Sequence, residues 1–367
     1  MKNKIKNSIL FLFPILLFSF SCQVEKNESI NVVSPTKEIS INEIFHELEI
    51  TPISFENIEG FGFVKKIEFL DNKLFILDDE FSKSLQIFDN KGGFIQKIQS
   101  FEKQNIYDFL IDIDNNIILL YTQGKRIEKY SIDGNYISTT RLDFVIEKLL
   151  TIQEGNLFCY LGYEPTSENE KFNIAVLDKN TFQLQNKLLP YQEEPILSIE
   201  ATNIFSPSKK DKLFSIPFDN NVYRLTSENA DIIYTLDFEN QFLTPELLNQ
   251  VENDFENKTT HIDGLVAFDD NLIFHYNKSG RPEYRLIRNN GAEVIKIKEG
   301  KNFTDFLISF SLLNHTIFKQ GEFISVIDLD HFRGLIDHFG ENIDPLHLKA
   351  FEGEALFAIF KYKFQTP

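Results

Sequence analysis

The chain has 367 residues, 42% of them hydrophobic, and 55 Asp and Glu against 37 Lys and Arg give a formal net charge of −18. A chain this hydrophobic can bury a sizeable core, which argues against intrinsic disorder. Its acidity argues against nucleic-acid binding and against charge-driven docking on anionic lipid, because both need a basic surface. Two cysteines are too few for a disulfide framework or a cysteine-based zinc site.

Residues 1–21 have the pattern of a secretion signal. Three lysines within the first six residues precede an almost wholly apolar stretch, Ile9–Phe20. This stretch is too short for a comfortable membrane span but has the length of a signal-peptide core. Two small residues, Ser19 and Ser21, then precede Cys22, and the arrangement resembles a bacterial lipoprotein signal. It differs from the familiar lipoprotein motif in having Ser19 where that motif has Leu.

The lipoprotein interpretation sets the expected organisation of the chain. Cys22 would become the lipidated first residue, residues 22–37 would form a flexible polar tether, and residues 38–367 would fold. The protein would then sit in the bacterial outer membrane as a lipoprotein facing the periplasm or the cell surface. An ordinary cleaved signal is the alternative, and it predicts a secreted protein. Cys159 lies in an apolar run and is expected to be buried in a strand.

A unit of four short strands recurs along the rest of the chain. In residues 64–98, apolar segments alternate with Asp-Asn and Asn-Lys-Gly-Gly turns, as in consecutive antiparallel hairpins. The second strands of successive units start at Leu74, Ile117, Leu157, Leu213, Leu272 and Phe323. These starts are separated by 43, 40, 56, 59 and 51 residues. Four strands at a period of about 50 residues are typical of a β-propeller blade.

The sequence therefore predicts an all-β fold, a six-bladed β-propeller of four-stranded antiparallel blades. Pairing of N- and C-terminal strands, residues 47–54 with residues 355–363, would close the ring and hide two edge strands. Two stacked all-β domains are the alternative architecture, but no Pro/Ser-rich linker divides residues 60–365.

One helix is expected, in the connection between the fourth and fifth blades. Thr244 can cap it, Pro245 suits its first turn, and apolar residues continue on one face to Phe255. The sixth repeat is expected to begin near Phe306 with its first strand.

The residues of the first repeat resemble a known motif. Leu74–Asp78, followed by Leu85–Asp89 and a Gly-Phe pair, is similar to the NHL-type repeat, from which the second repeat departs at Tyr121 and Tyr130. With its terminal strands, the mature chain resembles the six-bladed β-propeller lipoproteins of bacterial envelopes, whose function is largely unassigned. That resemblance implies a lipid-anchored propeller in settings of nutrient or glycan uptake, and it supplies no catalytic residues.

Residues for ligand binding can be proposed from the repeat alone. The sequence has no phosphate-binding glycine loop, no His-Glu-x-x-His motif and no Trp for an Asp-box or WD40 signature, so no catalytic residue, metal or cofactor is assigned. Propellers bind ligands near the axis through the loops that follow the second strand of each blade. The candidate ligand-binding residues at or near these loops are Asp79, Arg126, Tyr163, Asp219, His275, Tyr276 and Arg281.

Two functions stay open. The first is a non-enzymatic binding or scaffold protein, anchored to the membrane by lipid, with a glycan, a peptide or an envelope protein as its partner. The second is a hydrolase or lyase, suggested by His275, Tyr276 and Arg281 near the predicted mouth. Nucleic acid is not an expected partner in either case.

Overall fold

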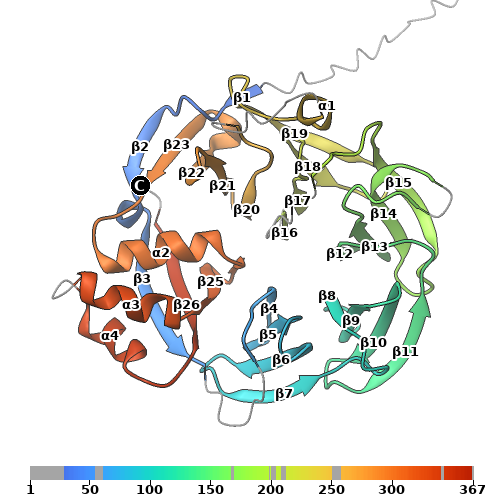
Figure 1. Ribbon diagram of the computed structural model, residues 1–367, viewed down its shortest axis with the longest axis horizontal. Helices are drawn as coiled ribbons and strands as arrows, with labels where there is room; N and C mark the ends of the chain where they lie inside the picture. Colours follow the sequence, from blue (N-terminus) through green and yellow to red (C-terminus); the bar gives the residue numbers. More distant parts are fainter. Residues whose placement is uncertain are drawn as a thin grey trace, which may run out of the picture.

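The computed structural model describes residues 29–53, 61–166, 169–197, 199, 204–207, 212–249, 258–339 and 343–365. The predicted signal and Cys22 lie outside the described residues. Six sheets stand around a central axis in a ring (Figure 1), which confirms the predicted six-bladed β-propeller. Within the described ranges, no helix is long and apolar enough to cross a membrane.

Blades 1 to 3 each consist of four consecutive antiparallel strands, the first innermost and the fourth outermost. Blade 1 contains β4 (Lys66–Leu70), β5 (Lys73–Asp78), β6 (Ser84–Asp89) and β7 (Phe94–Ile98). Blade 2 contains β8 (Ile106–Asp112), β9 (Ile117–Thr122), β10 (Arg126–Ser131) and β11 (Tyr136–Arg141). Blade 3 contains β12 (Lys148–Gln153), β13 (Asn156–Tyr160), β14 (Phe172–Asp178) and β15 (Leu184–Pro190).

Blades 4 and 5 each gain a fifth, outermost strand from the N-terminal segment. Blade 4 contains β16 (Phe205–Pro207), β17 (Lys212–Phe214), β18 (Asn221–Leu225) and β19 (Ala230–Asp237), with β1 (Ser29–Asn31) parallel to β19. Blade 5 contains β20 (Asp263–Phe268), β21 (Asn271–Lys278), β22 (Arg281–Arg288) and β23 (Glu293–Lys298), with β2 (Lys37–Ser40) parallel to β23. Part of this segment falls in the stretch that the sequence analysis assigned to a tether.

Blade 6 closes the ring with strands from both ends of the chain. It contains β24 (Thr316–Lys319), β25 (Glu322–Asp328), β26 (Phe357–Phe364) and, outermost, β3 (Phe45–Pro52). The antiparallel register places Ile359 opposite Thr51 and Lys361 opposite Glu49, which confirms the predicted pairing of the terminal strands. The edges of β3 and β26 are thereby paired to each other rather than exposed.

The helices differ from the prediction. The expected helix begins as predicted, as α1 (Pro245–Leu248), where the Thr244 side chain accepts a hydrogen bond from the Leu247 amide; its continuation to Phe255 lies outside the described residues. The prediction of a strand near Phe306 is wrong, because α2 (Phe303–Leu313) occupies this position.

Two further helices, α3 (Asp330–Phe339) and α4 (Pro345–Phe351), were also not predicted. They lie between β25 and β26 and gather with α2 beside blade 6 (Figure 1). Phe303 and Leu307, one turn apart in α2, are fully buried against Phe332 and Phe360. This helical spacing of apolar residues serves a core outside the blades. Two 3₁₀ turns, η1 (Ile41–Glu43) and η2 (Asn289–Gly291), complete the elements.

The hydrophobic core lies between neighbouring blades. Phe75 and Leu77 of blade 1 pack with Phe109 and Ile111 of blade 2, for example. Cys159 is fully buried in β13, in agreement with its expected place in a strand. A single blade cannot cover both of its faces, so each sheet depends on packing against the blades on either side.

Candidate binding site at the propeller axis

A cavity of about 810 Å³ lies at the centre of the ring. Its walls come from the inner strands of blades 1, 2, 3, 4 and 6, which are β4, β8, β12, β16 and β24. Because each inner strand is the first strand of its blade, all of them start at the same end of the ring. The loops that follow the second strands open at that end too, and we call it the mouth.

Lys66, at the start of β4, bonds to blades 2 and 3 and so links three blades at the mouth. Its Nζ lies 2.9 Å from Oδ1 of Asp108 in blade 2 and donates to the carbonyl oxygens of Phe109 at 2.7 Å and Leu149 of blade 3 at 3.1 Å. Asp108 Oδ2 in turn accepts a hydrogen bond of 2.5 Å from the Leu149 amide. The inner edge of a blade has no neighbouring strand, so these side chains satisfy backbone groups that would otherwise lack partners.

Asp79, a predicted ligand-binding residue, lies directly behind the mouth. Its Oδ2 is 2.7 Å from the Nζ of Lys65, and Lys65 lines the cavity. The Asp79 side chain is only 15% exposed. It therefore holds a lysine in place and does not itself line the cavity.

Lys148 and His315 face each other across the mouth. Lys148 begins β12 of blade 3, His315 directly precedes β24 of blade 6, and both line the cavity. The pKa of His315 is lowered to about 3, mainly by burial and in part by the charge of Lys148, while Asp263 acts in the opposite direction. The imidazole is therefore neutral at pH 7.

Glu68 lies deeper in the same cavity. It follows Lys66 by two residues on β4, so the two side chains lie on the same face of the strand. Burial raises its pKa to about 7; Lys66 and Lys319 oppose this shift and Asp108 adds to it. A carboxyl with this pKa is partly protonated at neutral pH, so the interior of the cavity carries less negative charge than its composition indicates.

His275 and Tyr276 are consecutive residues of β21, so their side chains point to opposite faces of blade 5. The His275 ring lies against Gly264, where a Cβ atom would come within 2.6 Å of the His275 Nδ1. Burial lowers the pKa of His275 to about 4. Tyr276 packs on the face toward blade 4. The structure therefore does not bring these two residues and Arg281 together as a catalytic group.

Tyr163 and Asp219 do come together, in the loops of blades 3 and 4. The Tyr163 hydroxyl donates to the carbonyl oxygen of Pro217 at 2.7 Å, and Asp219 Oδ2 accepts from the Tyr223 hydroxyl at 2.5 Å. Burial, with a contribution from the charge of Asp219, raises the pKa of Tyr163. Gly162, next to Tyr163, lines the cavity, so Tyr163 supports the wall from behind.

Arg126 and Arg281 begin the third strands of blades 2 and 5, as their loop positions required. Arg126 Nη2 lies 3.3 Å from Glu102 Oε2, and Arg281 is exposed. Neither is among the described residues that line the cavity.

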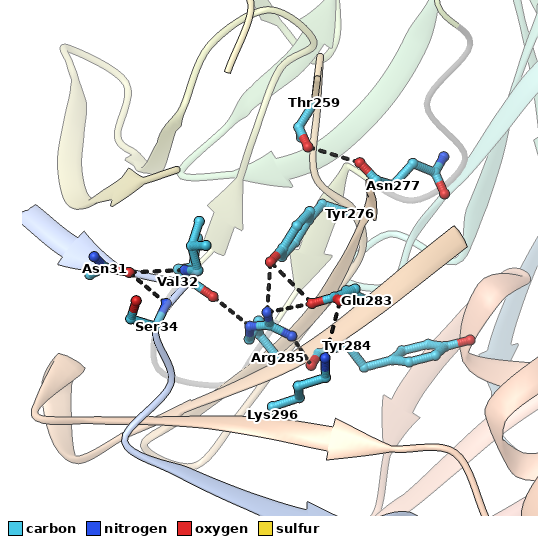
Figure 2. A network of polar contacts seen from close by, with 11 residues as sticks. Asn31, Val32, Ser34, Thr259, Tyr276, Asn277, Glu283, Tyr284, Arg285 and Lys296 are labelled. Carbon is cyan, nitrogen blue, oxygen red and sulfur yellow. Dashed lines mark hydrogen bonds and ion pairs between the residues drawn. The ribbon is translucent and has the colours of Figure 1, made fainter. Parts of the chain in front are cut away.

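Tyr276 belongs to a buried network that the sequence analysis missed (Figure 2). Its centre is Arg285, whose side chain is 1% exposed. Arg285 Nε donates to the carbonyl oxygen of Val32 at 2.6 Å, and its Nη2 donates to the Tyr276 hydroxyl and to Glu283, both at 2.6 Å. Glu283 also pairs with Lys296 at 3.1 Å. The network fastens the segment between β1 and β2 to blade 5.

The cavity residues Lys65, Lys66, Lys148 and His315 were also missed. A sequence signal for them exists: lysines occupy the start of the first strand in repeats 1 and 3, where an inner strand meets the mouth. Among the described residues, no group of three or more His, Cys, Asp and Glu is placed to hold a metal ion.

A known structure shares this architecture. A candidate exported protein from Bacteroides fragilis superposes with a TM-score of 0.74 at 16% identity, covering 92% of this chain and 100% of that one, a likeness that shows the fold alone. A Bacteroides caccae protein of unknown function matches with a TM-score of 0.40 at 12% identity, covering 64% of this chain and 81% of its own. No curated protein matches the sequence.

The sequence profile of a domain of unknown function, DUF4934, matches residues 27–354. This range takes in the N-terminal strands and blades 1 to 5, and it ends just before β26, the third strand of blade 6. The chain therefore belongs to the DUF4934 family.

Proposed function

We propose that this protein is an exported, lipid-anchored β-propeller that binds a small ligand in its axial cavity and does not transform it. The observation that carries the proposal is the cavity itself: its volume of about 810 Å³ lies within the range of small-molecule sites. Its lining combines apolar side chains with charged and polar ones, as is typical of such sites.

Binding is favoured over catalysis because several polar side chains near the cavity or proposed for catalysis make structural contacts. Lys66 and Asp108 hold blades together, and Tyr276 is fixed by Arg285. His275 and Tyr276, central to the hydrolase or lyase alternative, lie on opposite faces of a strand. A general base must reach the proton that it removes, and this pair has no shared site in which to do so.

The cellular setting follows from the sequence and from one relative. The apolar N-terminal stretch and Cys22 support export and lipid attachment, and the Bacteroides fragilis structure belongs to a candidate exported protein. A lipid at Cys22 would hold the acidic propeller at the outer membrane without any basic patch. A role in nutrient or glycan uptake, with a glycan, a peptide or an envelope protein as partner, is part of the same proposal.

The proposal is tested by narrowing the mouth. Val145 lines the cavity and is 39% exposed, so Val145→Trp adds bulk there at little cost to the core. Protein incubated with the small-molecule fraction of an envelope extract is washed and analysed by native mass spectrometry. We expect the wild type to retain a ligand mass and the variant to retain several-fold less.

The matched control is Ile95→Trp, because Ile95 is 45% exposed on the outer strand β7, away from the cavity. It should retain as much ligand as the wild type. Equal loss in both variants, or turnover of the retained molecule by the wild type, would contradict the proposal.

A further inference from the structure

The lysines at the mouth differ in whether their charge is already neutralised. Lys65 pairs with Asp79 at 2.7 Å and Lys66 with Asp108 at 2.9 Å. For the side chain of Lys148, by contrast, the described part of the chain offers no carboxylate within 4.0 Å and no hydrogen bond. One cation at the mouth of an acidic protein is thus left without a counterion.

Charges from several blades act on His315, which lines the same cavity as this cation. His315 responds to the charges of Lys148 in blade 3, of Lys65 and Lys66 in blade 1, and of Asp263 in blade 5. Since blades 3 and 6 stand opposite each other in a ring of six, Lys148 and His315 can interact only across the axis (Figure 1). The neutral His315 side chain likewise makes no hydrogen bond to a described residue, so it can bond to a ligand held by Lys148.

Below the mouth, apolar side chains from four blades form part of the wall. Ile67, Leu110, Leu150 and Ile317 line the cavity from blades 1, 2, 3 and 6. Removing apolar surface from water contributes about 25 cal/mol per Å², so this part of the cavity favours a hydrophobic body.

We infer that the axial site binds a small monocarboxylate, with its carboxylate on Lys148 within reach of His315 and its apolar body between the inner strands. This inference rests on the proposed function and specifies the ligand class of the same site. A dianion such as phosphate is less suited, because Lys148 is the only lysine at the mouth without a carboxylate partner among the described residues, and Asp108, Glu147 and Glu164 also line the cavity.

The test compares an acid with its neutral amide. Binding of 4-phenylbutyrate and of 4-phenylbutanamide to the mature protein is measured by isothermal titration calorimetry. The wild type should bind the acid at least about tenfold more tightly than the amide. Lys148→Gln should reduce this preference to about twofold or less while leaving the affinity for the amide unchanged, and Lys148→Arg should restore it.

The control variant is Lys97→Gln, which removes the same charge from an exposed position on β7 and should keep the full preference. A second pair, the dipeptide Leu-Phe and its C-terminal amide, distinguishes a peptide C-terminus from a free carboxylic acid as the source of the carboxylate. A preference for the acid in either pair that depends on Lys148 supports the inference.

Equal binding of acid and amide, or a preference that Lys148→Gln leaves intact, overturns the inference but leaves an axial binding site standing. Failure of every probe to bind also overturns it. The proposed function is then judged separately, by the ligand retention of Val145→Trp.

Discussion

Glu68 shows how a single side chain in the cavity takes its properties from three blades. It stands on β4, and the charges that act on it come from Lys66 of the same strand, Asp108 of blade 2 and Lys319 of blade 6. The sequence marks Glu68 only as an acid in a strand, since its neighbours in space are far away along the chain. Its raised pKa was therefore outside what the sequence could predict.

This raised pKa makes stability depend on pH. Because the folded pKa is about 7 and the ordinary value is 4.5, the folded state binds the proton more tightly than the unfolded state between these values. The free energy of unfolding contributed by Glu68 therefore falls as pH rises from about 5 to 8. Allowing for solvent screening of a partly exposed side chain, the loss is about 1–2 kcal/mol.

Urea unfolding at pH 5 and pH 8 measures this effect. The free energy of unfolding of Glu68→Gln, relative to that of the wild type, should be about 1–2 kcal/mol higher at pH 8 than at pH 5. Glu193→Gln, which changes an exposed loop carboxyl, should follow the wild type at both values. Parallel profiles for the wild type and Glu68→Gln would show that the carboxyl titrates normally.

At the scale of elements, the sequence predicted the strands inside the blades better than those added at their edges. The inner and middle strands alternate or run apolar between Asn, Asp and Gly turns, so local pattern suffices. β1 and β2 have three and four residues of mixed polarity, and their partners β19 and β23 lie some 200 and 260 positions away. Their pairing depends on the closed ring and leaves no local signal.

The helices beside blade 6 show a related limit. α2 stands where a first strand was expected near Phe306, since an apolar run of this length is ambiguous between helix and strand. Asn302 caps it by accepting a hydrogen bond from the Asp305 amide, a signal present in the sequence that was not used.

The N-terminal strands depend on Arg285. Replacing it by Met leaves the Val32 carbonyl, the Tyr276 hydroxyl and one side of Glu283 without their donor, at a cost of about 2–4 kcal/mol. We expect the amides of Val32 and Thr36, which bond to blades 4 and 5, to exchange hydrogen much faster in Arg285→Met.

Hydrogen exchange read by mass spectrometry checks this, with Lys296→Met as the control. Within the described part of the chain, the Lys296 side chain pairs only with Glu283, and it is 29% exposed, so its loss should change exchange in β1 little. Equal protection of residues 29–40 in the wild type and in Arg285→Met would mean that backbone pairing alone holds the segment.

At the scale of the whole molecule, the repeat period and the terminal strands were enough to predict six blades and their closure. The lining of the axial cavity was harder to predict, because it depends on how the inner strands of five different blades approach each other. Of the seven candidate residues, Asp79 and Tyr163 support the wall from behind, while Lys148 and His315, which line it, were not singled out. Loop position alone could not distinguish a residue at the mouth from one beside it.

The central claim is that the axial cavity is where this propeller binds its ligand. A crystal structure of the protein purified from its own cell envelope tests this most directly. The account predicts electron density for a small molecule in the cavity, between Leu150 and Ile317 and within reach of Lys148. A cavity that holds only water, with a ligand bound elsewhere, such as the groove between residues 45–48 and 298–305, would contradict it.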